Sequence, residues 1–518
     1  MGHVCRLAKG GLFLVLLSIC ACGDSVSEAP TGIETAQESA SSAQNSDYND
    51  AQNEFANDSQ IRDIPFSQSS SSESITPTSP VDLPSSSSSL WMQQISSSLQ
   101  MQQASSSSVE KIPLPNNGIP YVRIIATDSI DTGYVACAIE IAGNGQYEDI
   151  APASARIRQR GNSTRLWYDK KPYRIKLDNK TSILGLPANK DWVLLANYRD
   201  QSKFMNAIAF DMARYMGSFP FVNANRFVEV EINGDYMGMY QLTEQIERAT
   251  SRVDIDTSGV LLSLDMDDGP ELSPDAGNNF YSKVYGMPVA VKYPKNISAE
   301  RLEAIAADFA TLEQAIVSAD YDNVQKLMDM ESFIDFILLQ EITRNVELEA
   351  PRSMYLYKDG DGKYHMGPVW DFDGGFGYGW DEDTKEYFTS QSWILGTGNP
   401  SKSPYNCTAE SKNDWGMCNG ANMRFNSYDG RAVPGFFANM FANGTFLAAY
   451  RARWDSHKTG ILADAFAKLD AYVSQTAIAL ENDATRWPPI RRYDTEIQAL
   501  KKWLAERADN YSNVLANY

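Results

Sequence analysis

The sequence predicts an α+β fold in which an N-terminal sheet lobe precedes a mostly helical lobe. Short apolar runs, several of them strictly alternating, follow one another from residue 121 to residue 242, with one helical pattern among them. From residue 299 onwards the apolar residues recur mainly with helical spacing, apart from one hairpin. Strands grouped ahead of helices are typical of α+β proteins. We assign this domain to residues 113–433 and treat residues 434–518 as a helical C-terminal part packed on it.

The first 22 residues have the pattern of a secretory signal, with two basic residues, the apolar run Leu12–Leu17 and then small residues. Ile19–Cys22 resembles a bacterial lipobox that would place a lipid on Cys22. Cys20 departs from that pattern, so cleavage without lipidation stays open. We expect an exported protein of the bacterial cell envelope or outer surface, attached to the membrane through a lipid anchor.

Residues 23–112 are dominated by serine runs separated by Gln, Pro and Met. Such a composition buries too little apolar surface to offset the entropy of ordering, so we expect a disordered tether. Further along the chain, Cys407 and Cys418 lie close together in a polar segment. Because disulfides persist in exported proteins, we expect these two cysteines to form one.

The strands of the first lobe are expected where apolar residues alternate or cluster between turn residues. The expected strands are Tyr121–Ala126, Tyr134–Ile141, Tyr147–Arg160, Lys171–Leu177, Trp192–Ala196, Arg226–Ile232, Tyr236–Leu242, Val260–Leu264 and Val289–Tyr293. Asn233-Gly234 is a strong hairpin signal between two of them. Ser202–Met216 has helical spacing, and Gly161–Thr164 reads as a polar turn.

The helical lobe is expected to begin with helices at Ala299–Ser318 and Met330–Thr343. A hairpin made of Ser353–Lys358 and Lys363–Val369 follows and leads to two carboxylates. The tail from Pro434 reads as mainly helical. A ligand is expected in the cleft between the two lobes.

The most informative motif is the pair Asp371 and Asp373, which stands between the second strand of that hairpin and a glycine-rich turn ending at Gly377. Alternate residues of a strand point to the same face, so both carboxylates are predicted to reach one site. Carboxylate oxygens without a nearby histidine suit Mg²⁺ or Mn²⁺. Such an ion indicates a phosphate-bearing substrate. Asp265, Asp267 and Asp268 also follow a strand, and we interpret them as a solvated acidic loop rather than a Ca²⁺ site.

Composition excludes several other functions. The chain has only three histidines, and it lacks the glycine-rich phosphate-binding motifs of P-loop and dinucleotide-binding proteins. A net charge of −21 argues against nucleic acid as a partner. One segment, residues 156–180, is nevertheless strongly basic. Within it Arg158, Arg160 and Lys176 lie on or beside patterned strands, where they are predicted to contact a phosphate chain.

Five ordered motifs make the chain resemble the CotH family of atypical, spore-coat-type protein kinases, which also includes exported bacterial proteins. The motifs are Arg158-Gln-Arg-Gly-Asn-Ser-Thr164, Lys171-Pro-Tyr-Arg-Ile-Lys176, Trp192-Val-Leu-Leu-Ala-Asn197, Tyr240-Gln-Leu-Thr-Glu-Gln-Ile246 and Trp370-Asp-Phe-Asp-Gly-Gly-Phe-Gly377. The resemblance implies a two-lobe, kinase-like fold. It also implies transfer of the ATP γ-phosphate to Ser or Thr of a protein substrate with the help of a divalent cation.

The resemblance also implies roles for individual residues. Lys176 corresponds to the strand lysine that contacts the ATP phosphates, and Glu244 to a residue near the nucleotide. Asp371 corresponds to the metal-binding aspartate, with Asp373 beside it. The family pattern Asn-x-Asp falls on Asn345 and Glu347, so a glutamate stands where an aspartate that supports catalysis is expected.

Glu347 leaves three interpretations open. It works with adjusted geometry, or Glu349 or Asn345 takes its part, or the protein binds nucleotide without efficient transfer. Two other functions also remain. One is a non-catalytic surface or adhesion module that keeps the fold. The other is a metal-dependent nucleotide-sugar transferase, since an Asp-x-Asp pair also holds Mn²⁺ beside a sugar diphosphate.

Overall fold

A computed structural model of the chain describes residues 114–270, 272–348, 351–360, 362–377, 424–426 and 432–516. All of them lie within one unit of the chain, Ser85–Tyr518. Cys22, Cys407 and Cys418 fall outside the described residues, as do the signal and the tether. No helix in the described part of the chain is both long and apolar enough to cross a membrane.

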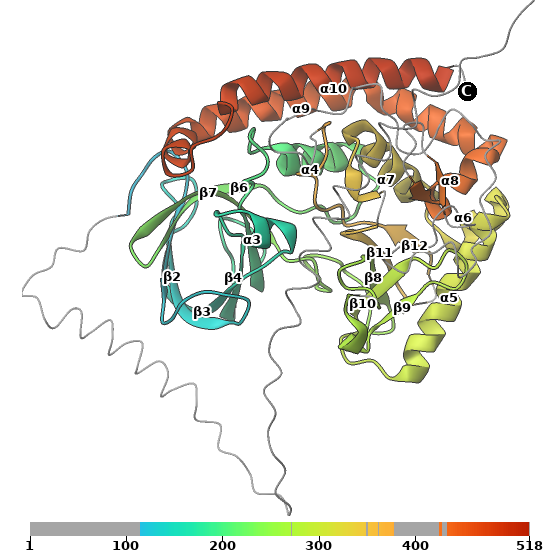
Figure 1. The fold of residues 1–518 in the computed structure, drawn as a ribbon, viewed down its shortest axis with the longest axis horizontal. Helices are drawn as coiled ribbons and strands as arrows, with labels where there is room; N and C mark the ends of the chain where they lie inside the picture. The colour runs from blue at the N-terminus through green and yellow to red at the C-terminus, as the bar shows by residue number, and fades with distance from the viewer. Residues whose placement is uncertain are drawn as a thin grey trace, which may run out of the picture. The chain divides into compact units, whose positions relative to one another are not determined.

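Seven strands form a closed barrel in the order β1-β2-β3-β4-β5-β7-β6 (Figure 1). They are β1 (Tyr121–Ala126), β2 (Val135–Ala142), β3 (Ile150–Gln159), β4 (Tyr173–Thr181), β5 (Asn189–Leu195), β6 (Arg226–Ile232) and β7 (Asp235–Glu244). Neighbouring strands pair antiparallel, except that β1 and β6 close the barrel with parallel pairing. The β6–β7 hairpin turns at Asn233 and Gly234, both with positive φ, as its sequence signal predicts.

Alternation along β3 and β4 separates an apolar interior from a charged outer face. Ile157 and Ile175 pair across these strands and are fully buried inside the barrel. The intervening register pairs place Arg156 opposite Lys176 and Arg158 opposite Arg174. Because strand side chains alternate between faces, these cations share the outer face of the barrel.

A second, five-stranded sheet has the order β12-β11-β8-β10-β9. Its strands are β8 (Val260–Leu264), β9 (Asn279–Tyr281), β10 (Pro288–Tyr293), β11 (Met354–Lys358) and β12 (Tyr364–Met366). Residues that are 90 positions apart in the sequence therefore pair in one sheet, as Met354 does with Leu264. This pairing fixes the position of the β11–β12 hairpin, and the loop that follows β12 forms the site described below.

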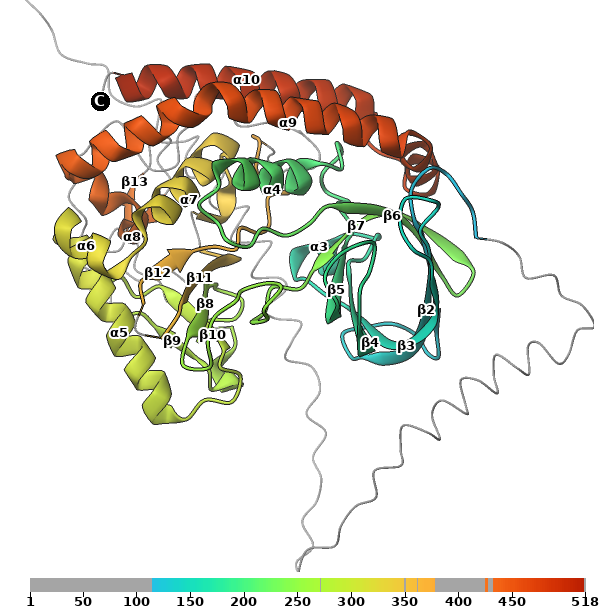
Figure 2. The ribbon, with the colours of Figure 1, turned by 180° about the vertical axis from the view of Figure 1, so that it is seen from behind.

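The helices pack around the second sheet and along the barrel. They are α3 (Ser163–Trp167), α4 (Met205–Met216), α5 (Ala299–Val317), α6 (Tyr321–Leu327), α7 (Met330–Thr343), α8 (Gly435–Ala438), α9 (Gly444–Arg486) and α10 (Tyr493–Ala516). The short strands β13 (Arg424–Asn426) and β14 (Ala432–Pro434) pair with each other. Figures 1 and 2 show α9 and α10 side by side, and α9 contacts α4, α7 and strand β7.

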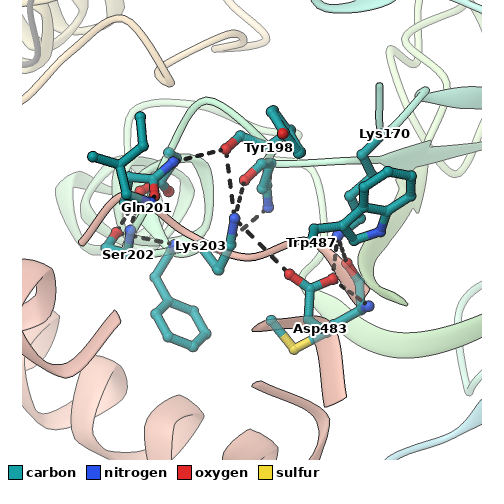
Figure 3. Close-up of polar contacts among 12 residues, drawn as sticks. Lys170, Tyr198, Gln201, Ser202, Lys203, Asp483 and Trp487 are labelled. Atoms are coloured by element: carbon teal, nitrogen blue, oxygen red, sulfur yellow. Dashed lines mark hydrogen bonds and ion pairs between the residues drawn. The ribbon is translucent and has the colours of Figure 1, made fainter. Parts of the chain in front are cut away.

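A buried ion pair joins α9 to the barrel (Figure 3). The Lys170 ammonium lies 2.5 Å from Asp483 Oδ1, and both side chains are almost fully buried. The same carboxylate oxygen accepts a hydrogen bond of 2.9 Å from the Met239 amide on β7. Lys203 approaches the other oxygen at 3.9 Å. A Cβ atom at Gly238 would lie only 2.3 Å from Asp483 Oδ1, so a glycine is required for this close approach.

The predicted α+β class is confirmed, and the chain has a strand-rich N-terminal region followed by a helical C-terminal region. Among the details that differ from the sequence-based expectation, three concern the first half of the chain. The first sheet is a closed barrel, and the strands at 260–264 and 288–293 belong to a separate sheet. The polar turn at Gly161 leads directly into helix α3, which the sequence did not indicate.

Candidate active site

The site is built on the loop that follows β12, where two aromatic residues anchor the backbone. Trp370 stacks on Phe210 of α4 at a ring distance of 5.9 Å. Phe372 is fully buried, and its amide donates a hydrogen bond of 2.7 Å to Asn206 Oδ1 on the same helix. Asp371 and Asp373 are only half-buried beside these anchors. The loop therefore buries its aromatic residues and presents its two carboxylates together.

The reason that the carboxylates meet differs from the expected strand alternation. Asp371 is not in a strand and has a left-handed backbone, with φ of 65°. The glycine-rich turn after Asp373 packs against the C-terminus of α7, because the Phe376 amide donates a hydrogen bond to the Thr343 carbonyl. The two carboxyl groups nevertheless interact electrostatically, because the negative charge of Asp373 raises the pKa of Asp371.

Asp371 is held by two neighbours from different elements. The Ser353 hydroxyl donates to Asp371 Oδ2 over 3.1 Å, and Asn345 Nδ2 donates to the Asp371 carbonyl over 2.9 Å. Burial and repulsion by Asp373 raise the pKa of Asp371 to about 7, against the opposing effect of Arg160. A carboxyl group in these surroundings is poised to exchange its proton for a cation.

Asp373 is positioned by the loop that precedes α4. Arg199 Nη1 donates a hydrogen bond of 3.0 Å to the Asp373 carbonyl. Asp200 accepts hydrogen bonds from the amide of Met205, the first residue of α4, over 2.7 Å and from Ser202, so this loop is itself firmly held. Burial raises the pKa of Asp373, with Arg199 opposing the shift and Asp200 adding to it.

Asn345 and Glu347 reach the site because α7 ends abruptly. Arg344 takes a left-handed conformation with φ of 48° and caps the helix. Asn345 is then fully buried, and its side-chain amide donates a hydrogen bond to the Asp371 carbonyl. Burial raises the pKa of Glu347 well above its usual range, and repulsion by Asp371 and Asp373 adds to this shift. Three carboxylates are thus electrostatically coupled at one place.

The predicted cations lie on the neighbouring face of the barrel. Arg160 lies over the Trp370 ring at 5.5 Å and interacts with Asp371. Burial lowers the pKa of Arg160, and repulsion by Arg174 and Arg158 lowers it further, so these three guanidinium groups lie near one another. The structure therefore brings Arg160 within electrostatic range of Asp371, whereas Arg158 lies over the Tyr134 ring at 5.3 Å.

Lys176 and Glu244 have partners within the barrel. Lys176 Nζ lies 3.6 Å from Asp191 Oδ2, and the Lys176 side chain is 33% exposed to solvent. Arg174 binds the other oxygen of Asp191 at 2.7 Å. The buried Glu244 carboxylate accepts hydrogen bonds from the Ala224 amide over 2.8 Å and from the Thr243 hydroxyl over 3.1 Å. Lys176 is thus available to a ligand, whereas Glu244 holds a turn.

The donor set fits a hard divalent cation through its carboxylate pair. Within the described ranges, no group of three or more His, Cys, Asp and Glu side chains is already arranged to hold a metal ion. Mg²⁺ commonly needs only one or two carboxylates, because water and substrate phosphates complete its coordination. Asp371 and Asp373 repel each other when both are charged, and a bound cation would relieve that repulsion.

We expect the free energy of unfolding of the metal-free chain to fall as the pH rises from about 4 to about 7. The folded pKa of Asp371 is raised from 3.8 to about 7, so the folded state binds more protons than the unfolded state in this window. Added Mn²⁺ replaces that proton, so it should stabilise the protein more at about pH 8 than at about pH 5.5. Urea unfolding at both pH values measures this effect, and equal stabilisation would contradict it. The Asp371→Asn variant is the control.

Sequence reasoning missed Ser353, Arg199 and Asn206, which position the carboxylates through hydrogen bonds. The only local signal was the polar run from Asn197 to Lys203, placed between a buried strand and a helix. The interpretation of Asp265 as a solvated residue is wrong, because this side chain is 7% exposed. Glu349 lies outside the described residues.

Comparison with known families agrees with this arrangement. The model of the family described as CotH kinase protein matches residues 157–511. A search among curated proteins finds no match. The match covers more than half of the chain and includes Arg158, Arg160 and Lys176, the α7 terminus and the Asp371 loop. The chain therefore belongs to the CotH kinase protein family.

Proposed function

We propose that this CotH family member transfers the γ-phosphoryl group of ATP to a Ser or Thr hydroxyl of a protein substrate, with Mg²⁺ or Mn²⁺. The observation that carries the proposal is the coupled pair Asp371 and Asp373 beside the guanidinium group of Arg160. Phosphoryl transfer relies mainly on positioning and charge neutralisation, which these groups are suited to provide.

Each group has a role in this proposal. Asp371 and Asp373 would hold the divalent cation, which neutralises phosphate charge when bound. Arg160 and Lys176 bind phosphate oxygens of ATP from the barrel. The oxygen of the acceptor hydroxyl bonds to the γ-phosphorus, and Glu347 takes the proton that this hydroxyl loses. ADP leaves with the electrons of the broken P–O bond. A carboxylate with a raised pKa suits this role near neutral pH.

Among the alternatives for the base, the contacts favour Glu347 over Asn345. The Asn345 amide is engaged with the Asp371 carbonyl, and it has no proton-accepting group with a pKa near neutrality. Asn345 therefore serves to position Asp371. Export and a lipid anchor at Cys22 remain part of the proposal, and they are supported by the sequence pattern of the first 112 residues.

A non-catalytic binding module is the second candidate, and one observation favours it: Glu347 stands where the family has an aspartate. The longer side chain shifts its carboxylate by about 1.5 Å, and a displacement near 1 Å can cost on the order of 100-fold in rate. A nucleotide-sugar transferase has less support, because the described N-terminal region is a closed barrel of mainly antiparallel strands rather than a βαβ unit.

Labelled ATP distinguishes these functions. The full-length protein is incubated with γ-labelled ATP, a serine-rich protein acceptor and either Mg²⁺, Mn²⁺ or EDTA. Metal-dependent labelling of the acceptor supports the kinase. ATP-induced thermal stabilisation without transfer supports a nucleotide-binding protein limited by Glu347. Neither labelling nor stabilisation would overturn the proposal and favour the non-catalytic module.

We expect Lys176→Met to raise the KM for ATP on the order of 10-fold, because ATP binding would lose one charge-assisted hydrogen bond. Lys176 is partly exposed on the outer face and shares Asp191 with Arg174, so its ammonium can turn to a phosphate. Steady-state kinetics at saturating metal measure the effect. Lys190→Met on the next strand, whose ammonium is bound to the Asp178 carbonyl, is the matched control. Equal KM values for the two variants would remove Lys176 from the ATP site.

A further inference from the structure

We propose that Ser353 is a positioning residue for Asp371, held in place by Asp265, and that it fixes the orientation in which Asp371 binds the divalent cation. This inference rests on the proposed metal site. Neither Ser353 nor Asp265 belongs to the motifs that identify the family in this sequence, and both lie at the end of the second sheet. Hydrogen bonds connect that end of the sheet to Asp371.

Asp265 continues the pairing of two strands beyond the last residues of their ladder. The β8–β11 register ends with Met354 opposite Leu264. One position further on, Asp265 Oδ2 accepts a hydrogen bond of 3.2 Å from the Ser353 amide. Asp265 Oδ1 accepts another of 3.0 Å from the Asp267 amide. Both oxygens of this buried carboxylate are thus used to fix local backbone, which explains why Asp265 is not solvated.

Ser353 adopts a conformation that its residue type disfavours. Its φ is 54°, in the left-handed region where glycine is the usual residue. A serine at this position carries a conformational cost that glycine would avoid. The hydroxyl provides what glycine lacks, since it donates a hydrogen bond of 3.1 Å to Asp371 Oδ2. The side chain therefore has a use at the site that offsets the backbone cost.

The hydrogen bond determines which part of the Asp371 carboxylate faces its neighbours. Oδ2 is held by Ser353, and the main chain is held by Asn345 from the other side. The remaining acceptor positions are left for Asp373 and a cation. Partners that orient a metal-binding carboxylate typically change metal affinity or activity by 10-fold or more. Loss of the Ser353 hydroxyl should therefore weaken cation binding without unfolding the protein.

Three substitutions separate positioning from a purely structural role. Ser353→Gly removes the hydroxyl and relieves the backbone, so it should leave urea stability of the metal-free chain unchanged or raised. Ser353→Ala removes the hydroxyl and keeps the strained backbone. Ser353→Thr keeps a hydroxyl and should retain Mn²⁺ binding, at a cost in urea stability because a β-branched residue is disfavoured at this left-handed position. Ser182→Ala, which removes a hydroxyl that donates a hydrogen bond of 2.7 Å to the Leu186 carbonyl in the β4–β5 loop, is the control away from the site.

The readout is Mn²⁺ affinity of the full-length protein, measured by electron paramagnetic resonance with the non-hydrolysable ATP analogue AMP-PNP present. We expect Ser353→Gly and Ser353→Ala to raise the Kd for Mn²⁺ on the order of 10-fold. Ser353→Thr and Ser182→Ala should bind like the native protein. Native affinity in Ser353→Gly, together with lost affinity in Asp371→Asn, overturns this inference alone. Mn²⁺ binding that is unaffected by Asp371→Asn overturns the proposed metal site, and this inference with it.

Discussion

Asp371→Asn is expected to abolish metal-dependent phosphoryl transfer, with a loss on the order of 1000-fold or more, while the fold persists. Asparagine keeps the size of the side chain and an oxygen that can accept the Ser353 hydrogen bond. It removes the charge needed to hold a divalent cation. Labelled ATP and an acceptor protein, with Mg²⁺ or Mn²⁺ at saturation, measure the loss.

The same substitution should stabilise the metal-free chain at neutral and higher pH. At that pH the charged form of Asp371 is unfavourable, because burial and repulsion by Asp373 raise its pKa to about 7. Removing that charge should raise the free energy of unfolding by about 1–3 kcal/mol. Lost activity combined with gained stability is the pattern of a functional residue that is unfavourable to the fold.

Asp308→Asn is the control for this experiment. Asp308 also accepts a hydrogen bond from a hydroxyl, that of Tyr364 on β12, at 2.7 Å. It has no contact with the candidate site, so transfer should continue at the native rate. Full activity of Asp371→Asn would remove this aspartate from the metal site and with it the proposed reaction.

Local sequence patterns were sufficient for most strands, because hydrophobic alternation and turn residues act over a few positions. The strand at Val260–Leu264 and the hairpin turning at Asn233 were predicted where the structure has them. Barrel closure was not predictable in this way. It depends on parallel pairing of Tyr121 with Glu229, more than 100 residues later, and no local pattern reports such a pairing.

The residues of the candidate site also differ in whether a local sequence pattern could identify them. Asp371 and Asp373 were found because paired carboxylates beside a glycine-rich turn stand out in a sequence, whereas Glu347 was assigned only through the resemblance to the CotH family. Ser353 and Arg199 were missed, because their value lies in hydrogen bonds to a loop that is distant along the chain. A serine or an arginine gives no sign of such a partner until the β8–β11 pairing and the Asp200 hydrogen bond to α4 are known.

Asp483→Ala is expected to destabilise the protein by about 3–5 kcal/mol, because it leaves a buried cation without its partner. Lys170 is fully buried, and burial already lowers its pKa to about 8 even with Asp483 beside it. The Met239 amide on β7 would lose its acceptor as well. Urea unfolding at neutral pH measures the change.

Two further variants test whether the missing charge partner causes this effect. Lys170→Met combined with Asp483→Leu removes both charges, so it should recover a large part of the loss, since an apolar pair of similar volume often replaces a buried ion pair at little cost. Asp470→Ala breaks the exposed pair of α9 with Lys501 of α10 and should cost no more than about 1 kcal/mol. A double variant as unstable as Asp483→Ala would instead attribute the loss to packing around Gly238, where a Cβ atom would lie 2.3 Å from Asp483 Oδ1.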